Sequence, residues 1–179
     1  MVLPNKPYLL ERVSEDHLDE ATKKKLDKIK SDSRKKILYL GAICRDRDLK
    51  SCAEAVKRMG PNYCLYILGR AVSQDTQKEL DELIAQYDCV EYLGFVKSPA
   101  HLAFVKYAYI GLLPYIISDK LRNISPLNSL YCAPNKIYEY AKYGLPMVGS
   151  DVLGLKEPFD KYNIGVCARE WTPEALEKA

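Results

Sequence analysis

The chain has 179 residues, 47% hydrophobic and 28% charged, which is the composition of one globular domain rather than of a disordered chain. Its 27 Lys and Arg against 24 Asp and Glu leave a formal net charge of only +3, which argues against a nucleic-acid partner. The six cysteines are widely spaced and no secretory signal is present, which indicates reduced thiols and a cytoplasmic location rather than a disulfide framework or a zinc site.

The chain begins with a segment that has no regular hydrophobic period. Residues 1–14 contain two prolines, so we expect them to be extended, and residues 15–30 follow as an amphipathic helix. The apolar stripe of this helix is narrow and consists of Leu18, Thr22, Leu26 and Ile29. The lysine run at 23–25 indicates a solvated face, with a membrane-binding patch as the open alternative.

From residue 36 onward, short apolar runs alternate with amphipathic helices. Strands are expected at 37–40, 64–68, 89–93 and 109–113, and helices at 49–59, 74–87 and 99–107. The apolar runs are continuous rather than alternating, which is typical of strands buried on both faces of a parallel sheet. The sequence therefore predicts a doubly wound, Rossmann-like α/β domain, whose ligands bind beyond the carboxyl ends of the strands.

The last third of the chain is less regular. Residues 115–132 lose the periodicity, and a long polar segment of this kind inside a compact domain is usually functional. A helix with Pro134 in its first position follows and is ended by Gly144, and it leads into a strand at 147–149. A final helix begins near Thr172 and stops at the chain end after about two turns, which suggests a truncated C-terminal end.

The loop after the first strand begins with Gly41 and lacks the G-x-G-x-x-G pattern of dinucleotide binders. A glycine here lets the backbone approach a ligand closely, and Arg47 at the lip of the loop is suited to bidentate phosphate contacts. The alternative is that Arg45 and Arg47 are neutralised by the neighbouring aspartates on the surface.

Two later strands end in glycine at the same edge of the sheet. For Gly69 an ordinary turn is the simpler interpretation. After the next strand, Phe95 and Val96 offer an apolar face and backbone groups that suit a nucleobase. Packing of Val96 into the core is the alternative.

The helix that begins at Pro134 has the features of an anion-binding site. The unpaired N–H groups of its first turn carry the positive end of the helix dipole, which favours a diphosphate there. Glu139 lies one turn further in and suits sugar hydroxyls, although an ordinary pair with Lys136 or Lys142 is equally compatible with the spacing.

Other site types find little support. The two histidines, His17 and His101, have no metal-ligand company, and neither a Walker loop nor a G-x-S-x-G nucleophile elbow is present. The sequence therefore predicts no metal site and no cofactor.

The segment Pro134-Asn135-Lys136-Ile137-Tyr138-Glu139-Tyr140, followed by Gly144-Leu145-Pro146, is similar to the P-N-K-x-x-E-Y segment of capsule and lipopolysaccharide transferases. Through it, the chain resembles the C-terminal, nucleotide-sugar-binding domain of GT-B glycosyltransferases of the group 1 family, over about residues 2–178. The resemblance implies that residues 1–14 are the remnant of an interdomain linker and that 15–179 are the donor-binding domain.

The resemblance also implies roles for individual residues. Glu139 would bind the donor ribose, the turn at Phe95 and Val96 would bind the base, and Arg47 with Lys136 would stabilise the departing diphosphate. The implied donor-binding set is Gly41, Arg47, Gly69, Phe95, Val96, Asn135, Lys136 and Glu139.

The chain departs from the family pattern at two positions. Ala42 stands where an arginine often follows the first-strand glycine, and Tyr131 stands where the first of two signature glutamates is expected. That glutamate usually approaches the donor sugar, so the contacts to the sugar are the part of the site that the resemblance describes least well.

The implied function is transfer of a sugar, of the hexosyl type, from a nucleotide diphosphate sugar to an acceptor in surface polysaccharide or lipopolysaccharide synthesis, without a metal. The acceptor site would lie on a missing N-terminal domain, so the isolated chain would be inactive. The full enzyme would be cytoplasmic, with peripheral association at the inner face of the membrane as an option. A sugar-nucleotide epimerase of the same fold and a non-catalytic signalling module of the receiver type are the alternatives.

Overall fold

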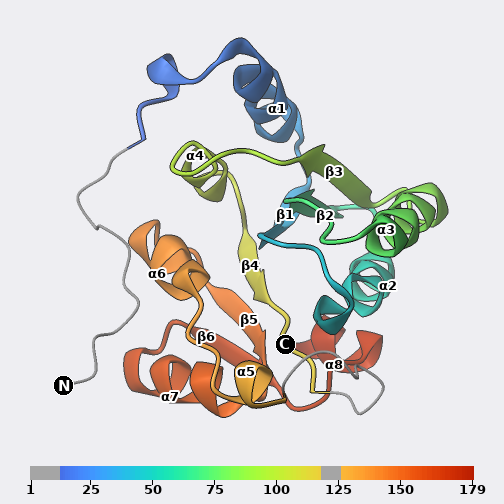
Figure 1. The fold of residues 1–179 in the computed structure, drawn as a ribbon, viewed down its shortest axis with the longest axis vertical. Coiled ribbons are helices and arrows are strands. Elements are labelled where there is room, and N and C mark those ends of the chain that lie inside the picture. The colour runs from blue at the N-terminus through green and yellow to red at the C-terminus, as the bar shows by residue number, and fades with distance from the viewer. Residues whose placement is uncertain (1–12, 118–125) are drawn as a thin grey trace.

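The computed structural model describes residues 13–117 and 126–179, so most of the segment interpreted as a linker lies outside the described residues. A six-stranded sheet with the order β3-β2-β1-β4-β5-β6 forms the centre, and every neighbouring pair is parallel (Figure 1). The strands are β1 (Lys35–Leu40), β2 (Tyr63–Leu68), β3 (Val90–Gly94), β4 (Ile110–Leu113), β5 (Met147–Ser150) and β6 (Gly165–Ala168). This order confirms the predicted doubly wound, Rossmann-like fold.

Helices cover both faces of the sheet (Figure 1). They are α1 (Glu20–Ser31), α2 (Leu49–Met59), α3 (Gln74–Gln86), α4 (Leu102–Val105), α5 (Pro126–Leu130), α6 (Asn135–Lys142), α7 (Leu153–Tyr162) and α8 (Pro173–Lys178). Along β1, Leu38 and Leu40 pack with α1, α4, α6 and α7, whereas Ile37 and Tyr39 pack with α2 and α3. Successive side chains of a strand point to opposite faces, so each strand contributes to two separate cores.

Helix α1 has the amphipathic pattern expected from its sequence. The four residues of the predicted apolar stripe are buried: Thr22, Leu26 and Ile29 lie in α1, and Leu18 lies just before it, after a 3-10 turn at Glu15–His17. Lys23, Lys28 and Lys30 pair with the carboxylates of Glu20, Glu91 and Glu15. Within the described residues no helix has the length and apolar character needed to cross a bilayer.

The C-terminal third contains elements that the sequence pattern does not predict. Helix α7 carries an internal Pro158, and β6 has only four residues, so neither shows a clear period. Strand β6 exists because Gly165–Ala168 pair in register with β5, which is a tertiary contact. The short helix α5 likewise lies within the segment that we expected to be irregular.

Three helix boundaries also differ from expectation, the first being the start of α1, which begins at Glu20 rather than at residue 15. Helix α4 covers four residues rather than the range 99–107. Pro134 is the N-cap and not the first helical residue, because its ψ of 137° is extended, while its carbonyl accepts a hydrogen bond from the Ile137 N–H at 3.2 Å. The first helical amides therefore belong to Asn135 and Lys136.

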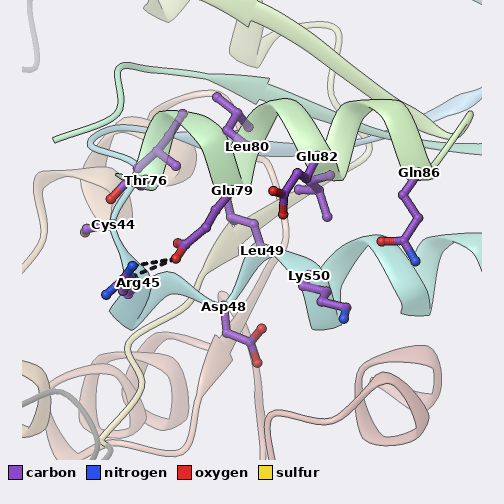
Figure 2. A pocket seen from close by; sticks show the side chains of 12 residues that line it. Cys44, Arg45, Asp48, Leu49, Lys50, Thr76, Glu79, Leu80, Glu82 and Gln86 are labelled. Atoms are coloured by element: carbon purple, nitrogen blue, oxygen red, sulfur yellow. Dashed lines mark hydrogen bonds and ion pairs between the residues drawn. The ribbon is translucent and has the colours of Figure 1, made fainter. Parts of the chain in front are cut away.

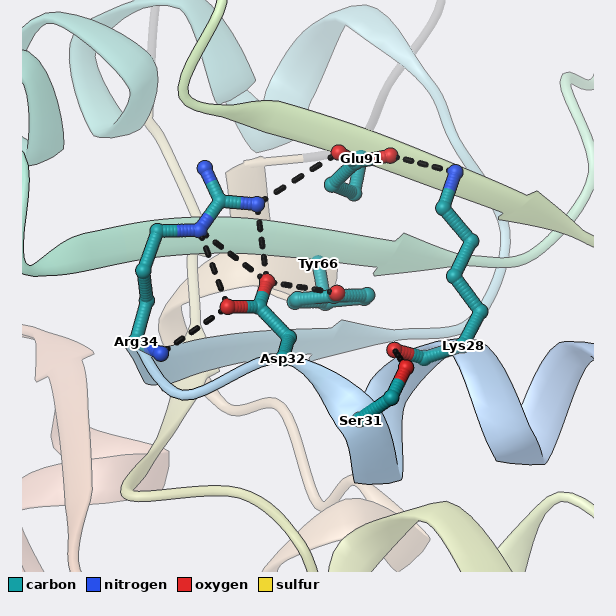
Figure 3. Close-up of polar contacts among 6 residues, drawn as sticks. All are labelled: Lys28, Ser31, Asp32, Arg34, Tyr66 and Glu91. Carbon is teal, nitrogen blue, oxygen red and sulfur yellow. Dashed lines mark hydrogen bonds and ion pairs between the residues drawn. The ribbon is translucent and has the colours of Figure 1, made fainter.

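A polar cluster fastens the end of α1 to the sheet (Figure 3). Asp32 accepts hydrogen bonds from the Arg34 guanidinium at 2.7 Å and from the Tyr66 hydroxyl at 2.8 Å. Glu91 of β3 pairs with Arg34 and, at 2.6 Å, with Lys28. Burial alone would raise the pKa of Asp32, but the hydrogen bonds from Arg34 and Tyr66 outweigh it and lower the pKa to about 2.

Replacing Asp32 by asparagine is expected to lower the free energy of unfolding at pH 7 by about 2 kcal/mol. A carboxyl whose pKa is lowered by folding stabilises the protein above its unfolded pKa of 3.8, and this contribution disappears as the pH falls towards 2. Urea unfolding between pH 2 and 7 should therefore show a shallower acid decline in the variant than in the wild type. Asp27→Asn, at an exposed position of the same helix, is the control, and equal effects of the two substitutions would contradict the prediction.

Candidate functional site

A cavity of about 700 Å³ opens at the carboxyl ends of β1, β2 and β3. It is lined by Leu40, Gly41, Ala42, Leu68, Gly69, Arg70, Ala71, Val72, Phe95, Val96, Ser98, His101, Asn135 and Glu139. The structure thus brings together most of the predicted site residues, which come from four separate stretches of the chain. The two remaining ones, Arg47 and Lys136, do not line this cavity; the Lys136 ammonium lies against Gly41, and both cations lie over the ring of Tyr115.

Glycine is required where β1 and β2 approach each other at the edge of the cavity. A Cβ at Gly69 would lie 1.8 Å from the carbonyl oxygen of Gly41, so no side chain fits there. Gly41 has a φ of 124°, which is strained for any other residue. Gly69 is therefore more than an ordinary turn residue, because its lack of a side chain lets the ends of β1 and β2 lie this close together at the cavity wall.

The turn after β3 presents one exposed and one buried apolar side chain. Phe95 is 54% exposed, and the guanidinium of Arg70 lies 5.3 Å from the centre of its ring. Val96 is 8% exposed and packs into the core, which was the alternative to a role in base binding. It also lines the cavity. Lys25 of α1 donates a hydrogen bond to the carbonyl of Phe95 at 3.2 Å, so α1 holds this turn in place.

Helix α6 is seated on the sheet by Tyr140. The Tyr140 side chain is fully buried, and its hydroxyl donates to the Leu38 carbonyl at 3.3 Å and accepts from the Leu40 N–H at 3.2 Å. Its ring lies over Gly111, where a Cβ would come within 2.5 Å of the ring. These contacts fix which side chains of α6 face the carboxyl edge of the sheet.

The N-terminus of α6 has no side-chain cap, so the first amides of the helix have no side-chain acceptor in the described part of the chain. Lys136 runs from this first turn to the Gly41 loop, where a Cβ on Gly41 would lie 2.9 Å from its Nζ. The ammonium lies 5.3 Å from the ring centre of Tyr39 and 5.7 Å from that of Tyr115. Burial, together with the charge of Arg47, lowers the pKa of Lys136 to about 8.

Arg47 is buried beside this lysine. Its side chain is 12% exposed, pairs with Asp46 at 2.5 Å and lies over the ring of Tyr115 at 4.1 Å. Its Nε and the second carboxylate oxygen of Asp46 are buried without a hydrogen-bond partner among the described residues.

Mutual neutralisation of the loop charges on the surface is therefore wrong. Arg45 pairs with Glu79 instead, and Asp48 caps α2 by accepting from the Ser51 N–H. Arg47 and Asp46 do pair, but in the interior, because Tyr39 and Tyr115 enclose this end of the loop.

Glu139 lines the cavity with a side chain that is 15% exposed. Its side-chain partner within the described residues is His101 of the turn before α4, with Nε2 3.3 Å from Oε1, rather than a lysine of its own helix. This contact could not be predicted from the sequence, because the two residues are 38 positions apart. Arg70 and Lys25 were missed for the same reason, since only the folded chain brings them to the site.

A second cavity, of about 270 Å³, lies between α2 and α3 (Figure 2). Among its charged residues, Arg45 pairs with Glu79 of α3. It contains none of the predicted site residues. In the described part of the chain, no group of three or more His, Cys, Asp or Glu is placed to hold a metal ion.

Comparisons with known proteins agree with this fold. The model of a family described as "Glycosyl transferases group 1" matches residues 34–179. No curated protein matches the chain significantly. Among solved structures, Anabaena Alr3699/HepE in complex with UDP and glucose superposes with a TM-score of 0.66 at 16% identity, covering 93% of this chain and 42% of that one.

Two further structures are similar. The C-terminal domain of the glycosyl transferase group 1 family protein LpcC from Francisella tularensis has a TM-score of 0.61 at 13% identity, with 89% of this chain and 80% of that one covered. A putative UDP-N-acetylglucosamine 2-epimerase from Listeria monocytogenes has a TM-score of 0.60 at 12% identity, with 93% and 39% covered. At these identities the likeness concerns the fold, and the chain spans less than half the length of HepE.

Proposed function

Because the chain belongs to the group 1 glycosyl transferases, we propose that it is the donor-binding domain of a glycosyltransferase and that the cavity at the carboxyl edge of the sheet binds the nucleotide of a nucleotide diphosphate sugar. One observation carries this proposal above all. Glu139, the uncapped start of α6 and the Phe95 turn surround a single cavity although they are distant in sequence.

The residues around the cavity suit the three parts of such a ligand. The exposed ring of Phe95 offers a stacking surface for the base, and Glu139 offers a carboxylate to the ribose hydroxyls. The diphosphate then reaches the first amides of α6, close to Lys136 and Arg47. The HepE structure contains UDP, which is consistent with a ligand of this class.

The proposed contribution to catalysis is electrostatic. As the bond between the sugar and the diphosphate breaks, negative charge grows on the departing diphosphate, and fixed positive groups stabilise it. Lys136 and Arg47 are held in place before the ligand binds, by the tyrosine rings and by Asp46. We assign them the catalytic roles in this domain, with no metal required.

The acceptor and any catalytic base would come from a second, N-terminal domain, since the matched HepE chain is more than twice as long as the matched region. We therefore expect the isolated chain to bind the donor but to be inactive. The narrower assignment, hexosyl transfer in surface polysaccharide or lipopolysaccharide synthesis by a cytoplasmic enzyme at the membrane surface, is supported by the P-N-K-x-x-E-Y segment alone.

The receiver-type module and the epimerase are disfavoured by different observations. A receiver-type module is disfavoured by the sheet, because its order 3-2-1-4-5-6 differs from the flavodoxin-like order 2-1-3-4-5. An epimerase would use a similar nucleotide site, and the family match favours a transferase. Product analysis with the complete protein separates these two activities.

Calorimetry with UDP, GDP and ADP tests the proposal. We expect the wild type to bind at least one of them, and Glu139→Ala to weaken that binding about 10- to 100-fold, because a hydrogen bond to a charged group is worth about 1.5–3 kcal/mol. Glu157→Ala, at an exposed position of α7, should bind like the wild type. Absence of binding to all three nucleotides would count against the proposed function.

A further inference from the structure

His101 lies at the wall of the proposed nucleotide site, in contact with the residue assigned to the ribose. It immediately precedes α4, which packs against α6. Its side chain is 16% exposed, and that of Glu139 is 15% exposed, so both groups are largely withdrawn from solvent. A pair in this position restricts the orientation of the Glu139 carboxylate more than a surface pair would.

The two ring nitrogens of His101 have different surroundings. Nε2 lies 3.3 Å from Oε1 of Glu139, whereas Nδ1 is buried without a hydrogen-bond partner among the described residues. A carboxylate only accepts hydrogen bonds, so the contact requires a proton on Nε2. Within the described residues, the polar contact of the His101 ring is thus the one from Nε2 to Glu139.

We propose that His101 is a positioning residue, which donates a hydrogen bond from Nε2 to one oxygen of Glu139 and thereby orients the other oxygen towards the ribose hydroxyls. This inference rests on the proposed function, because it assumes that Glu139 binds the ribose. It makes the His101–Glu139 pair the determinant of selectivity for ribonucleotides over deoxyribonucleotides.

Calorimetry with UDP and 2′-deoxy-UDP tests the pair. We expect the wild type to prefer UDP by about tenfold, as for one hydrogen bond to a charged group. His101→Leu should bring this preference close to unity with little change for 2′-deoxy-UDP. His101→Gln keeps a side-chain N–H donor and should retain much of the preference.

Glu139→Ala should also abolish the preference, and adding His101→Leu to it should have no further effect, because the two residues act as one unit. Loss of the preference in Glu139→Ala but not in His101→Leu would overturn the positioning role alone, as would additive effects. No binding of either nucleotide by the wild type, or binding without any preference, would overturn both the ribose role of Glu139 and the role of His101.

A second measurement requires no variant in the site. The chain has two histidines, and His17 is exposed, so long-range ¹H–¹⁵N spectra of the wild type resolve the protonation of each ring, with His17→Gln as the assignment control. We expect a proton on Nε2 of His101 in the folded protein. A neutral ring protonated on Nδ1 would overturn the proposal even if His101→Leu failed to fold.

Discussion

Lys136→Met is expected to weaken UDP binding about 100-fold and, at the same time, to stabilise the unliganded domain. The loss of binding follows from the loss of a charge-assisted contact to the diphosphate, worth about 1.5–3 kcal/mol. The gain in stability follows from the position of the ammonium, which is enclosed between the Gly41 loop and two tyrosine rings and lies near the charge of Arg47.

The lowered pKa of Lys136 determines the sign of the stability change. Burial and Arg47 lower the pKa of Lys136 from 10.5 to about 8, so below pH 8 the folded state carries a charge that it disfavours, at a cost on the order of 3 kcal/mol. Between pH 8 and 10.5 the unfolded state binds more protons, so wild-type stability should rise with pH. The Lys136→Met variant has neither this free-energy cost nor the rise of stability with pH.

Calorimetry and urea unfolding at pH 7 to 10 measure the two effects. Lys78→Met, at an exposed position of α3, is the matched control and should change neither binding nor stability. A variant that lost UDP binding and was also less stable than the wild type at pH 7 would show that Lys136 contributes to folding, contrary to this prediction.

Gly69→Ala is expected to destabilise the fold by at least about 3 kcal/mol, at the upper end of the range for overpacking. The added Cβ would lie 1.8 Å from the Gly41 carbonyl oxygen and 2.9 Å from its carbon, and both belong to backbone rather than to a flexible side chain. The ends of β1 and β2 would have to separate, which would also widen the wall of the nucleotide site. Urea unfolding and UDP binding should both report the change.

Gly144→Ala provides the control for the loss of a glycine as such. Gly144 has a φ of 66°, and a Cβ there meets no atom within 4 Å, so only the backbone conformation is penalised, by about 1–2 kcal/mol. We expect Gly69→Ala to be clearly the more damaging of the two. The reverse order would mean that the strand ends yield easily and that Gly69 is an ordinary turn residue.

Only part of the site could be predicted from the sequence. Gly41 and Phe95 were identifiable because each directly follows a strand, and Glu139 because it lies one turn into a helix whose start has a local signal. The buried positions of Arg47 and Lys136 could not be predicted, because the enclosing rings of Tyr39 and Tyr115 come from β1 and from the segment after β4. The pair of His101 and Glu139 depends on how α4 packs against α6.

The order of strands and helices through residue 113 follows from the hydrophobic pattern, which also predicts α2 at its observed bounds, because hydrophobic period and capping are local properties. Strand β6 and helix α7 depend instead on tertiary contacts, because β6 pairs with β5 and α7 packs its Leu155 and Phe159 into the core. Tertiary structure also decided which charges are buried, since the environment of a side chain depends on neighbours that are distant in the chain.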